Sequence, residues 1–352
     1  MNMPKGVTEV SQSIYSLHMV IFWICVVIGV IVFGVMFWSI LAHRKSQGAT
    51  PAHFHESTTV EILWTLIPLL ILIGMAIPAT RTLVEMYDTS KSDVDIKISG
   101  YQWKWRYEYL QDGFDYFSNL STPRDQIYNR DVKGEHYLLE VDEPLVIPVG
   151  KKVRFLLTAN DVIHSWWVPD LGVKKDAIPG FINETWTRVD KPGIYRGQCT
   201  ELCGKDHGFM PVVVKAVPEE EYNAWVAERK AAAEAERELT SKAWSLEELM
   251  TRGEQTYATF CAACHMPNGA GMPPAFPALK GSPIALGDVA AHIDIVVNGK
   301  AGTAMQSFGG QLNPVDLAAV ITYERNAWGN NVGDTVTPQD IVAFIQSKGG
   351  AQ

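Results

Sequence analysis

The 352-residue sequence predicts a multidomain membrane protein with a two-helix transmembrane hairpin, an all-β domain and an all-α domain. Three observations support this fold class. Two long uncharged segments lie near the N-terminus, short β-rich segments separated by turn residues follow them, and helical patterns occupy the rest of the chain. We expect the hairpin at 1–92, the β domain at 93–217, a helical linker at 218–243 and the α domain at 244–352.

The two membrane spans are expected at about 19–42 and 62–84. The first is 24 residues long without a charge, and the uncharged part of the second is 19 residues long. Each can cross a hydrocarbon core of about 30 Å, since a helix rises about 1.5 Å per residue. A secretory signal peptide has a shorter apolar core and a small-residue cleavage site, which the first segment lacks.

The orientation of the hairpin follows from the charges that flank it. His43, Arg44 and Lys45 lie between the spans, against a single Lys5 before the first, so this loop is expected in the cytoplasm. The N-terminus and everything after about residue 85 then lie on the periplasmic or extracytoplasmic side. The formal net charge of −9 usually indicates only a soluble acidic surface. Since an acidic surface does not attract a polyanion, we expect no nucleic-acid partner.

The β domain is predicted from short runs of β-branched and aromatic residues with Pro-Gly, Asp-Gly and Val-Gly turns between them. Trp103 and Trp105 occupy alternate positions, as in a strand, and core packing is the usual reason for such a pair. The other expected strands are 94–98, 137–141, 145–148, 153–157, 185–189 and 210–214.

A twelve-residue stretch contains Cys199, Cys203, His207 and Met210. Thiolate and thioether are soft ligands that favour copper, and imidazole suits copper as well. A mononuclear blue-copper site uses a single Cys, so the second thiolate indicates two bridging thiolates that hold two copper ions. A second His is then needed, and His164, in a strand-like aromatic run, is the best candidate upstream.

Two other interpretations of this stretch are weaker. A disulfide between Cys199 and Cys203 would explain both cysteines but neither His207 nor Met210. Zinc could use two Cys and two His, but a thioether is a poor zinc ligand and the spacing differs from that of a zinc finger.

The α domain carries a second motif. A segment rich in Ala, Glu and Arg, from Glu219 to Lys242, is expected to be a solvated helical spacer. An amphipathic stretch, 246–260, then leads to Cys261-Ala-Ala-Cys264-His265. This C-x-x-C-H motif predicts covalent haem attachment through both thiols, with His265 as the iron ligand. A redox dithiol would need a surrounding βαβ pattern, and a zinc site would need further cysteines downstream. The sequence shows neither around this motif.

The sixth iron ligand is less directly defined. Met266 adjoins His265 and cannot reach the opposite haem face, whereas chain length excludes neither Met272 nor Met305. Met305 precedes an expected helix at 314–325, and this order resembles that of a class I cytochrome c. We therefore expect Met305 as the ligand, and a His/Met pair would raise the haem potential.

The twelve-residue stretch is similar to the CuA loop of cytochrome c oxidase subunit II. The likeness covers about residues 15 to 217 in order, including 59–65, 102–109, 161–166 and 175–180. It implies a cupredoxin-like Greek-key domain, here with a fused C-terminal cytochrome c domain. It further implies a subunit of a proton-pumping, oxygen-reducing oxidase in the bacterial cytoplasmic membrane, with subunits I and III as partners.

The resemblance also implies roles for single residues at the copper site. His164 and His207 would each bind one copper, Cys199 and Cys203 would bridge both, and Met210 would be a weak axial ligand. Electrons would pass from an external cytochrome or other donor to the fused haem, then to the dinuclear copper centre, then to haem in subunit I.

Three further residues have a family role and a simpler alternative. The carbonyl of Glu201 would reach a copper and its carboxylate a magnesium or manganese ion shared with subunit I, where the alternative is solvent exposure. Trp103 would be the electron-entry residue, where the alternative is core packing. Glu61 would stand at a proton-channel mouth, although a Glu there also suits the helix dipole.

Other functional classes fit the motifs less well. A quinol-oxidase-like subunit II would share the hairpin and β domain but lacks the copper ligands. A CuA protein of another respiratory reductase, such as nitrous oxide reductase, would need a large His-rich domain. A copper chaperone with Cys-x-x-x-Cys lacks the downstream His and Met.

Overall fold

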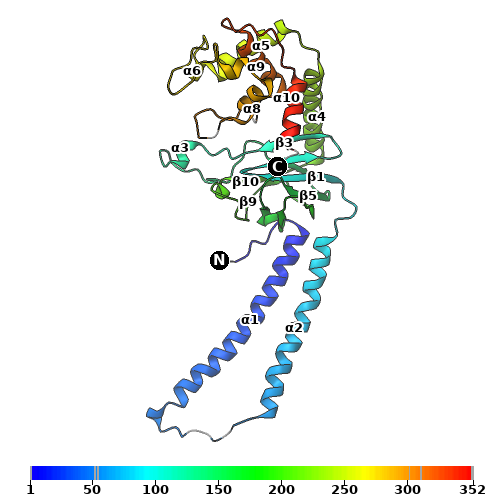
Figure 1. Ribbon diagram of the computed structural model, residues 1–352. Helices are drawn as coiled ribbons and strands as arrows, with labels where there is room; N and C mark the ends of the chain where they lie inside the picture. The colour runs from blue at the N-terminus through cyan, green and yellow to red at the C-terminus, as the bar shows by residue number, and fades with distance from the viewer. Residues whose placement is uncertain (1, 51–52, 54, 301, 310, 350–352) are drawn as a thin grey trace. The chain divides into compact units, whose positions relative to one another are not determined.

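The computed structural model describes residues 2–50, 53, 55–300, 302–309 and 311–349 (Figure 1). Contacts within the chain divide it into two compact units, Met1–Glu228 and Arg229–Gln352. The first unit contains the helical hairpin and the β domain, and the second contains the α domain. Each unit is described by itself below.

The hairpin consists of α1 (Glu9–Ala42) and α2 (Thr58–Tyr87), with the short η1 (Lys45–Gln47) between them. Both helices are long and apolar enough to cross a membrane, and their large hydrophobic side chains are exposed. They extend beyond the expected spans. Helix α1 begins early because Thr8 and Ser11 form a capping box, and Pro68 and Pro78 lie inside α2 without ending it.

The β domain is a sandwich of two five-stranded sheets, with strand orders β3-β2-β1-β5-β8 and β4-β10-β9-β6-β7. Alternate residues face the interior, and Ile96, Ile98, Trp105, Phe155 and Trp166 are fully buried there. This confirms the predicted cupredoxin-like class. The strands are β1 (Val94–Tyr101), β2 (Lys104–Tyr109), β3 (Phe114–Ser118), β4 (Leu145–Pro148), β5 (Val153–Ala159), β6 (His164–Val168), β7 (Val173–Ala177), β8 (Asn183–Thr187), β9 (Gly193–Cys199) and β10 (Pro211–Val217).

The strand predictions were right in most places and wrong in one. The segment 137–141 is not a strand, because Leu138 has φ +61° and breaks the extended chain; Val141 makes only an isolated bridge with Leu120. Trp105 lies in β2 and is buried, whereas Trp103 lies in the turn before it and is half-buried. The two tryptophans therefore do not share one strand face.

Both ends of the hairpin are joined to the β domain. The hydroxyl of Thr8 donates to the carbonyl of Leu171 (2.9 Å), at the end of η2 (Pro169–Leu171). The indole of Trp186 in β8 donates to the carbonyl of Glu85 near the end of α2 (3.1 Å). The hydrogen bonds thus attach both spans to the sandwich at the ends opposite to the connecting loop.

The linker helix α4 (Glu219–Ser241) is less solvated than predicted. Tyr222 and Val226 in its first turns are buried, and the ring of Trp225 lies 5.2 Å from that of Tyr109 and 5.5 Å from that of Phe114. The prediction of a solvated spacer was therefore wrong for these turns, because their aromatic face packs on the β domain. Beyond Glu228 the helix is mostly exposed.

The second unit is all-helical, as predicted. Helix α9 is buried over most of its length and packs closely on α5, where a Cβ on Gly253 would lie 2.1 Å from the carbonyl oxygen of Ala319. The α5 bounds are those predicted, and α9 continues one residue beyond the expected end. The helices are α5 (Leu246–Phe260), α6 (Ala262–His265), α7 (Pro283–Leu286), α8 (Val289–Asn298), α9 (Pro314–Asn326) and α10 (Pro338–Gly349).

Candidate copper and haem sites

The predicted copper ligands lie on a loop that two paired strands hold at both ends. Cys199 is the last residue of β9, and Met210 directly precedes β10, its antiparallel neighbour. The amide of Cys199 donates to the carbonyl of Met210 (3.2 Å) and closes the loop. Cys199, Cys203 and Met210 are each at most 2% exposed.

The sulfur and nitrogen atoms of the loop converge. The Sγ atoms of Cys199 and Cys203 are 3.9 Å apart, and Cys203 Sγ lies 3.4 Å from Nδ1 of His207 and 3.5 Å from Sδ of Met210. One imidazole nitrogen of His164 lies within 4.8 Å of both thiols. The structure thus brings all five predicted side-chain ligands together from two separate segments.

His164 opens β6 and is fully buried. Its Nε2 contacts a carboxylate oxygen of Asp161 (2.8 Å), while its Nδ1 is buried with no hydrogen-bond partner in the described part of the chain. Gly100 in β1 makes room for the ring, since a Cβ there would lie 2.8 Å from His164 Cδ2. An unpartnered buried nitrogen beside two buried thiols fits a metal of soft-ligand preference.

The electrostatics of the two thiols also favour a cation. Burial raises the pKa of Cys203 to about 12, and the charge of Cys199 adds to the shift. Burial opposes ionisation of Cys199 too, but the neighbouring His164 imidazole and main-chain groups of Ser165 and Glu201 outweigh this effect and lower the pKa of Cys199. Ionisation of one thiol therefore hinders ionisation of the other, and a bound cation would stabilise both thiolates.

The main-chain carbonyl and the side chain of Glu201 have different environments. Its main-chain carbonyl accepts a hydrogen bond from Cys199 Sγ (3.3 Å), so it points at the thiols. Glu201 is exposed, and so is the adjacent Leu202, at 79%.

Trp103 contacts the copper loop directly. Its indole nitrogen donates to the carbonyl of Cys203 (3.1 Å), and the side-chain amide of Gln102 donates to the same oxygen (2.8 Å). The main-chain amide of Gln102 donates to Asp161 (2.7 Å). Sequence reasoning missed Gln102 and Asp161, although both lie in the motifs around Trp103 and His164; a carboxylate three residues before a ligand histidine was the available signal.

Glu61 lies elsewhere. It occupies the first turn of α2, at the end of that helix remote from the β domain, and its side chain is exposed (Figure 1). The structure does not bring it to the copper ligands.

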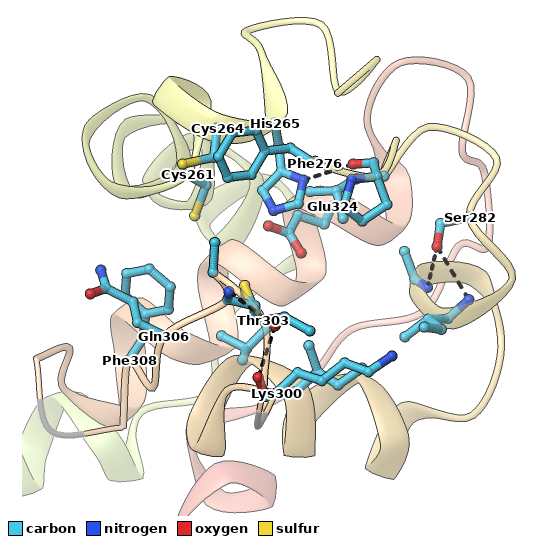
Figure 2. Close-up of a pocket in the computed structure, with 18 of the residues that line it drawn as sticks. Cys261, Cys264, His265, Phe276, Ser282, Lys300, Thr303, Gln306, Phe308 and Glu324 are labelled. Atoms are coloured by element: carbon cyan, nitrogen blue, oxygen red, sulfur yellow. Dashed lines mark hydrogen bonds between the residues drawn. The ribbon is translucent and has the colours of Figure 1, made fainter. Parts of the chain in front are cut away.

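The C-x-x-C-H motif spans the end of α5 and the short α6. Cys261, Cys264 and His265 line a largely apolar cavity of about 400 Å³. In Figure 2 they lie on one side of it, and the segment with Lys300 and Thr303 lies on the other. His265 Nδ1 lies 2.9 Å from the carbonyl of Pro277 and must be the donor, which leaves Nε2 for iron.

Met305 lines the same cavity, whereas Met272 and Met266 are not among its lining residues and are 42% and 38% exposed. Two thiols, one imidazole and one thioether around an apolar cavity suit a covalently bound haem. The placement supports Met305 over the two other methionines.

Three family descriptions match the chain. Residues 1–82 match "Cytochrome C oxidase subunit II, transmembrane domain", and residues 94–217 match "Cytochrome C oxidase subunit II, periplasmic domain". Residues 248–323 match "Cytochrome C oxidase, cbb3-type, subunit III".

Curated relatives and solved structures are also similar. The chain is 41% identical over 221 residues to the probable cytochrome c oxidase subunit 2 of Rickettsia prowazekii, covering 62% of this chain and 69% of that one. It is 40% identical over 230 residues to the Rickettsia bellii protein, covering 65% and 84%. The crystal structure of the periplasmic domain of subunit II (CoxB) of Bradyrhizobium japonicum is 41% identical, covering 41% of this chain and 98% of that one, with a TM-score of 0.37.

The fold and the two clusters define a two-span membrane protein that joins a cupredoxin-like domain to a cytochrome c domain. The chain belongs to the cytochrome c oxidase subunit II family, and so to a subunit class of the haem-copper oxidases.

Proposed function

We propose that the chain is the electron-entry subunit of a proton-pumping cytochrome c oxidase and that it binds a dinuclear CuA centre and one covalent haem c. The observation that carries this proposal is the convergence of two buried thiols, 3.9 Å apart, with two imidazoles and a thioether. One copper would need one thiolate, and the second favours a bridged pair.

In the proposed route, an external cytochrome or other donor reduces the cytochrome c domain. The electron then enters the cupredoxin-like domain at Trp103 and is transferred to haem in subunit I. Oxygen reduction and proton pumping take place in that subunit. The hydrogen bond from Trp103 to the Cys203 carbonyl supports this entry point, because it joins a half-buried aromatic ring to a bridging ligand.

The copper pair, when bound, supplies a one-electron carrier. The protein's part is to hold the ligands still. Cys199, Cys203, His207 and Met210 would hold the pair from the loop, and His164 from β6. Asp161 accepts from His164 Nε2, which fixes the ring and leaves Nδ1 for the metal.

The haem, when bound, supplies the second one-electron carrier. Cys261 and Cys264 would attach it, and His265 Nε2 would ligate the iron while Nδ1–H remains bonded to Pro277. Met305 would be the sixth ligand from the far side of the cavity.

The remaining assignments concern partners and domain limits. The Glu201 carboxylate would help bind magnesium or manganese at the boundary with subunit I, and Glu61 would stand at a proton-channel mouth in the complex with subunits I and III. The hairpin would lie in the bacterial cytoplasmic membrane, with both C-terminal domains on the periplasmic side. The proposed domain limits are 1–92, 93–217, 218–243 and 244–352.

The test uses the assembled oxidase and oxygen uptake driven by a reduced external donor. Cys203→Ser should abolish uptake and the dinuclear copper signal while the haem c absorbance remains, because the two ligand sets belong to different domains. Cys25→Ser, which alters the exposed cysteine of α1, is the matched control and should keep both. Normal uptake in the Cys203→Ser enzyme would contradict the proposal.

A further inference from the structure

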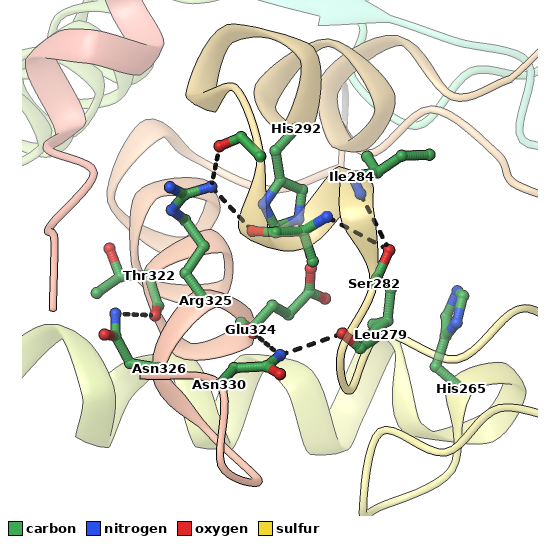
Figure 3. Close-up of polar contacts among 12 residues, drawn as sticks. His265, Leu279, Ser282, Ile284, His292, Thr322, Glu324, Arg325, Asn326 and Asn330 are labelled. Carbon is green, nitrogen blue, oxygen red and sulfur yellow. Dashed lines mark hydrogen bonds and ion pairs between the residues drawn. The ribbon is translucent and has the colours of Figure 1, made fainter. Parts of the chain in front are cut away.

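The side-chain amide of Asn330, in the segment after α9, is buried, and both its nitrogen and its oxygen are hydrogen-bonded. The nitrogen donates to the main-chain carbonyls of Leu279 (3.1 Å) and Glu324 (2.8 Å), as Figure 3 shows. The oxygen accepts from the main-chain amide of Gly281 (2.8 Å). Asn330 is 3% exposed, and burial of a polar amide is costly without such partners. The side chain thus joins the end of α9 to residues 279–281.

The segment that Asn330 holds carries the hydrogen-bond partner of the predicted iron ligand. Nδ1 of His265 donates to the carbonyl of Pro277 (2.9 Å), and Pro277 shortly precedes Leu279 in the chain. The amide of Leu279 donates to the carbonyl of Gly269 (2.8 Å) and closes the loop between these two residues. The position of the Pro277 carbonyl therefore depends on how firmly this loop is held at its base.

Trp328 holds the other end of the same loop. Its indole nitrogen donates to the carbonyl of Pro267 (3.1 Å). A Cβ on Gly269 would lie 2.4 Å from Cε3 of Trp328, so the ring packs directly on that glycine. The segment after α9 therefore contacts the loop at both ends, through Trp328 at Gly269 and through Asn330 at Leu279.

We propose that Asn330 is a positioning residue for His265, because it holds the Pro277 carbonyl at hydrogen-bond distance from Nδ1. The inference rests on the proposed haem attachment at Cys261 and Cys264. A carbonyl that accepts from the outer ring nitrogen fixes the orientation of the imidazole and raises its basicity as a ligand. A more basic imidazole stabilises ferric iron more than ferrous iron, so this bond lowers the midpoint potential of the haem.

The sign of the change in potential separates this role from a purely structural one. If Asn330 only stabilised the fold, its loss would loosen the cavity and release Met305, and the potential would fall because a thioether ligand raises it. If Asn330 positions Pro277, its loss weakens the bond to His265 while Met305 stays in place. The potential then rises, and the absorbance of a haem with His and Met ligands is unchanged.

Asn326 in α9 provides a matched control, because its side chain has the same bonding pattern in a different place. Its nitrogen donates to the carbonyls of Thr322 (2.9 Å) and Asp334 (3.0 Å), and Figure 3 shows the first of these bonds. Its oxygen accepts from the amide of Gly333 (2.7 Å). Asn326→Ala therefore removes as many bonds to the main chain, but none of them is to the residues 269–281.

The experiment is a potentiometric titration of the haem absorbance in the full chain. Asn330→Ala should raise the equilibrium constant for haem reduction by up to about tenfold, or about 59 mV for one electron. Asn330→Ser, which keeps one polar group, should give a smaller rise, and Asn326→Ala should keep the wild-type potential. An unchanged or lower potential in Asn330→Ala, an equal rise in Asn326→Ala, or an absorbance that marks loss of the thioether ligand would overturn the inference.

Hydrogen exchange of the haem-loaded wild type decides if neither Asn330 variant folds. The amide of Gly281 donates to Asn330, so it should exchange roughly tenfold or more slowly than an amide in an unfolded peptide. Exchange at the unfolded rate would show that the bond is absent and would overturn the inference. A wild type with no covalent haem would overturn the proposed function itself, on which the inference rests.

Discussion

The indole nitrogen of Trp103 donates a hydrogen bond of 3.1 Å to the main-chain carbonyl of Cys203. The contact joins the β1–β2 turn to the copper loop, and Gly204 lets the loop approach the ring: it has φ +118°, and a Cβ there would lie 3.0 Å from Trp103 Cζ2. The sequence alone is compatible with either core packing or electron entry for Trp103. The structure places its ring against Cys203, a candidate bridging ligand.

Replacement of Trp103 tests this contact. Trp103→Ala should slow reduction of the copper centre in rapid-mixing experiments while both copper ions stay bound, because the ring is lost and every ligand remains. Trp186→Ala removes an indole that also donates to a carbonyl, that of Glu85, and should leave the rate unchanged. Loss of copper in the Trp103 variant would assign this residue a structural role instead.

Asp161 should control copper retention. Its carboxylate contacts His164 and accepts from the amide of Gln102, and loss of such a partner typically costs about 10- to 100-fold in metal affinity. Asp161→Asn should therefore lose copper at lower chelator concentration than the wild type. Asp176→Asn, on β7 beside β6, removes an exposed carboxylate and serves as control. Equal retention in both variants would exclude a positioning role for Asp161.

The choice between two methionines can be tested by one matched pair. Met305→Leu should change the haem absorbance to that of a five-coordinate or differently ligated iron and lower the midpoint potential, since a thioether ligand raises it. Met272→Leu should change neither. The reverse pattern would assign the ligand to Met272.

Trp225 should contribute to the stability of the β domain. Its ring packs against Tyr109 and Phe114, and truncation of a buried tryptophan costs about 3–5 kcal/mol, less for this half-buried ring. We expect Trp225→Ala to lower the free energy of unfolding by about 2 kcal/mol, measured by denaturant titration of the copper absorbance. Trp244→Ala, beyond α4, should have no such effect on this domain.

Acid should weaken the second unit through Asp334. The hydrogen bond from buried Arg325 lowers the pKa of Asp334 below its ordinary value of 3.8. This stabilisation is complete above pH 3.8 and is lost as pH falls through the lower, folded pKa. Asp334→Asn should cost about 1 kcal/mol near neutral pH, after allowance for screening of a partly exposed carboxylate. The difference from the wild type should disappear in acid; a constant difference in thermal unfolding across pH would contradict this origin.

The sequence predicted what local chemistry determines. Cys199, Cys203, His207 and Met210 lie within twelve residues, and Cys261 to His265 form one motif, so residue type and spacing are enough to propose them as candidate ligands. Contacts set by the tertiary fold could not be predicted in this way. His292 and Glu324 are 32 residues apart on two helices, and only the packing of α8 near α9 brings them together.

The prediction of a strand at 137–141 was wrong for a related reason. Its β-rich composition is real, but the positive φ of Leu138 depends on the surrounding loop and not on residue type. Likewise, the charge of the linker helix predicted solvation, while the aromatic face of Tyr222 and Trp225 finds a partner only in the folded β domain.

The central claim is that this chain carries a dinuclear copper centre and a covalent haem c. Electron paramagnetic resonance of the purified, oxidised chain, combined with copper and haem analysis, tests it most directly. We expect two coppers that share one unpaired electron, together with one c-type haem per chain. An isolated mononuclear copper signal, with one copper per chain, would contradict it.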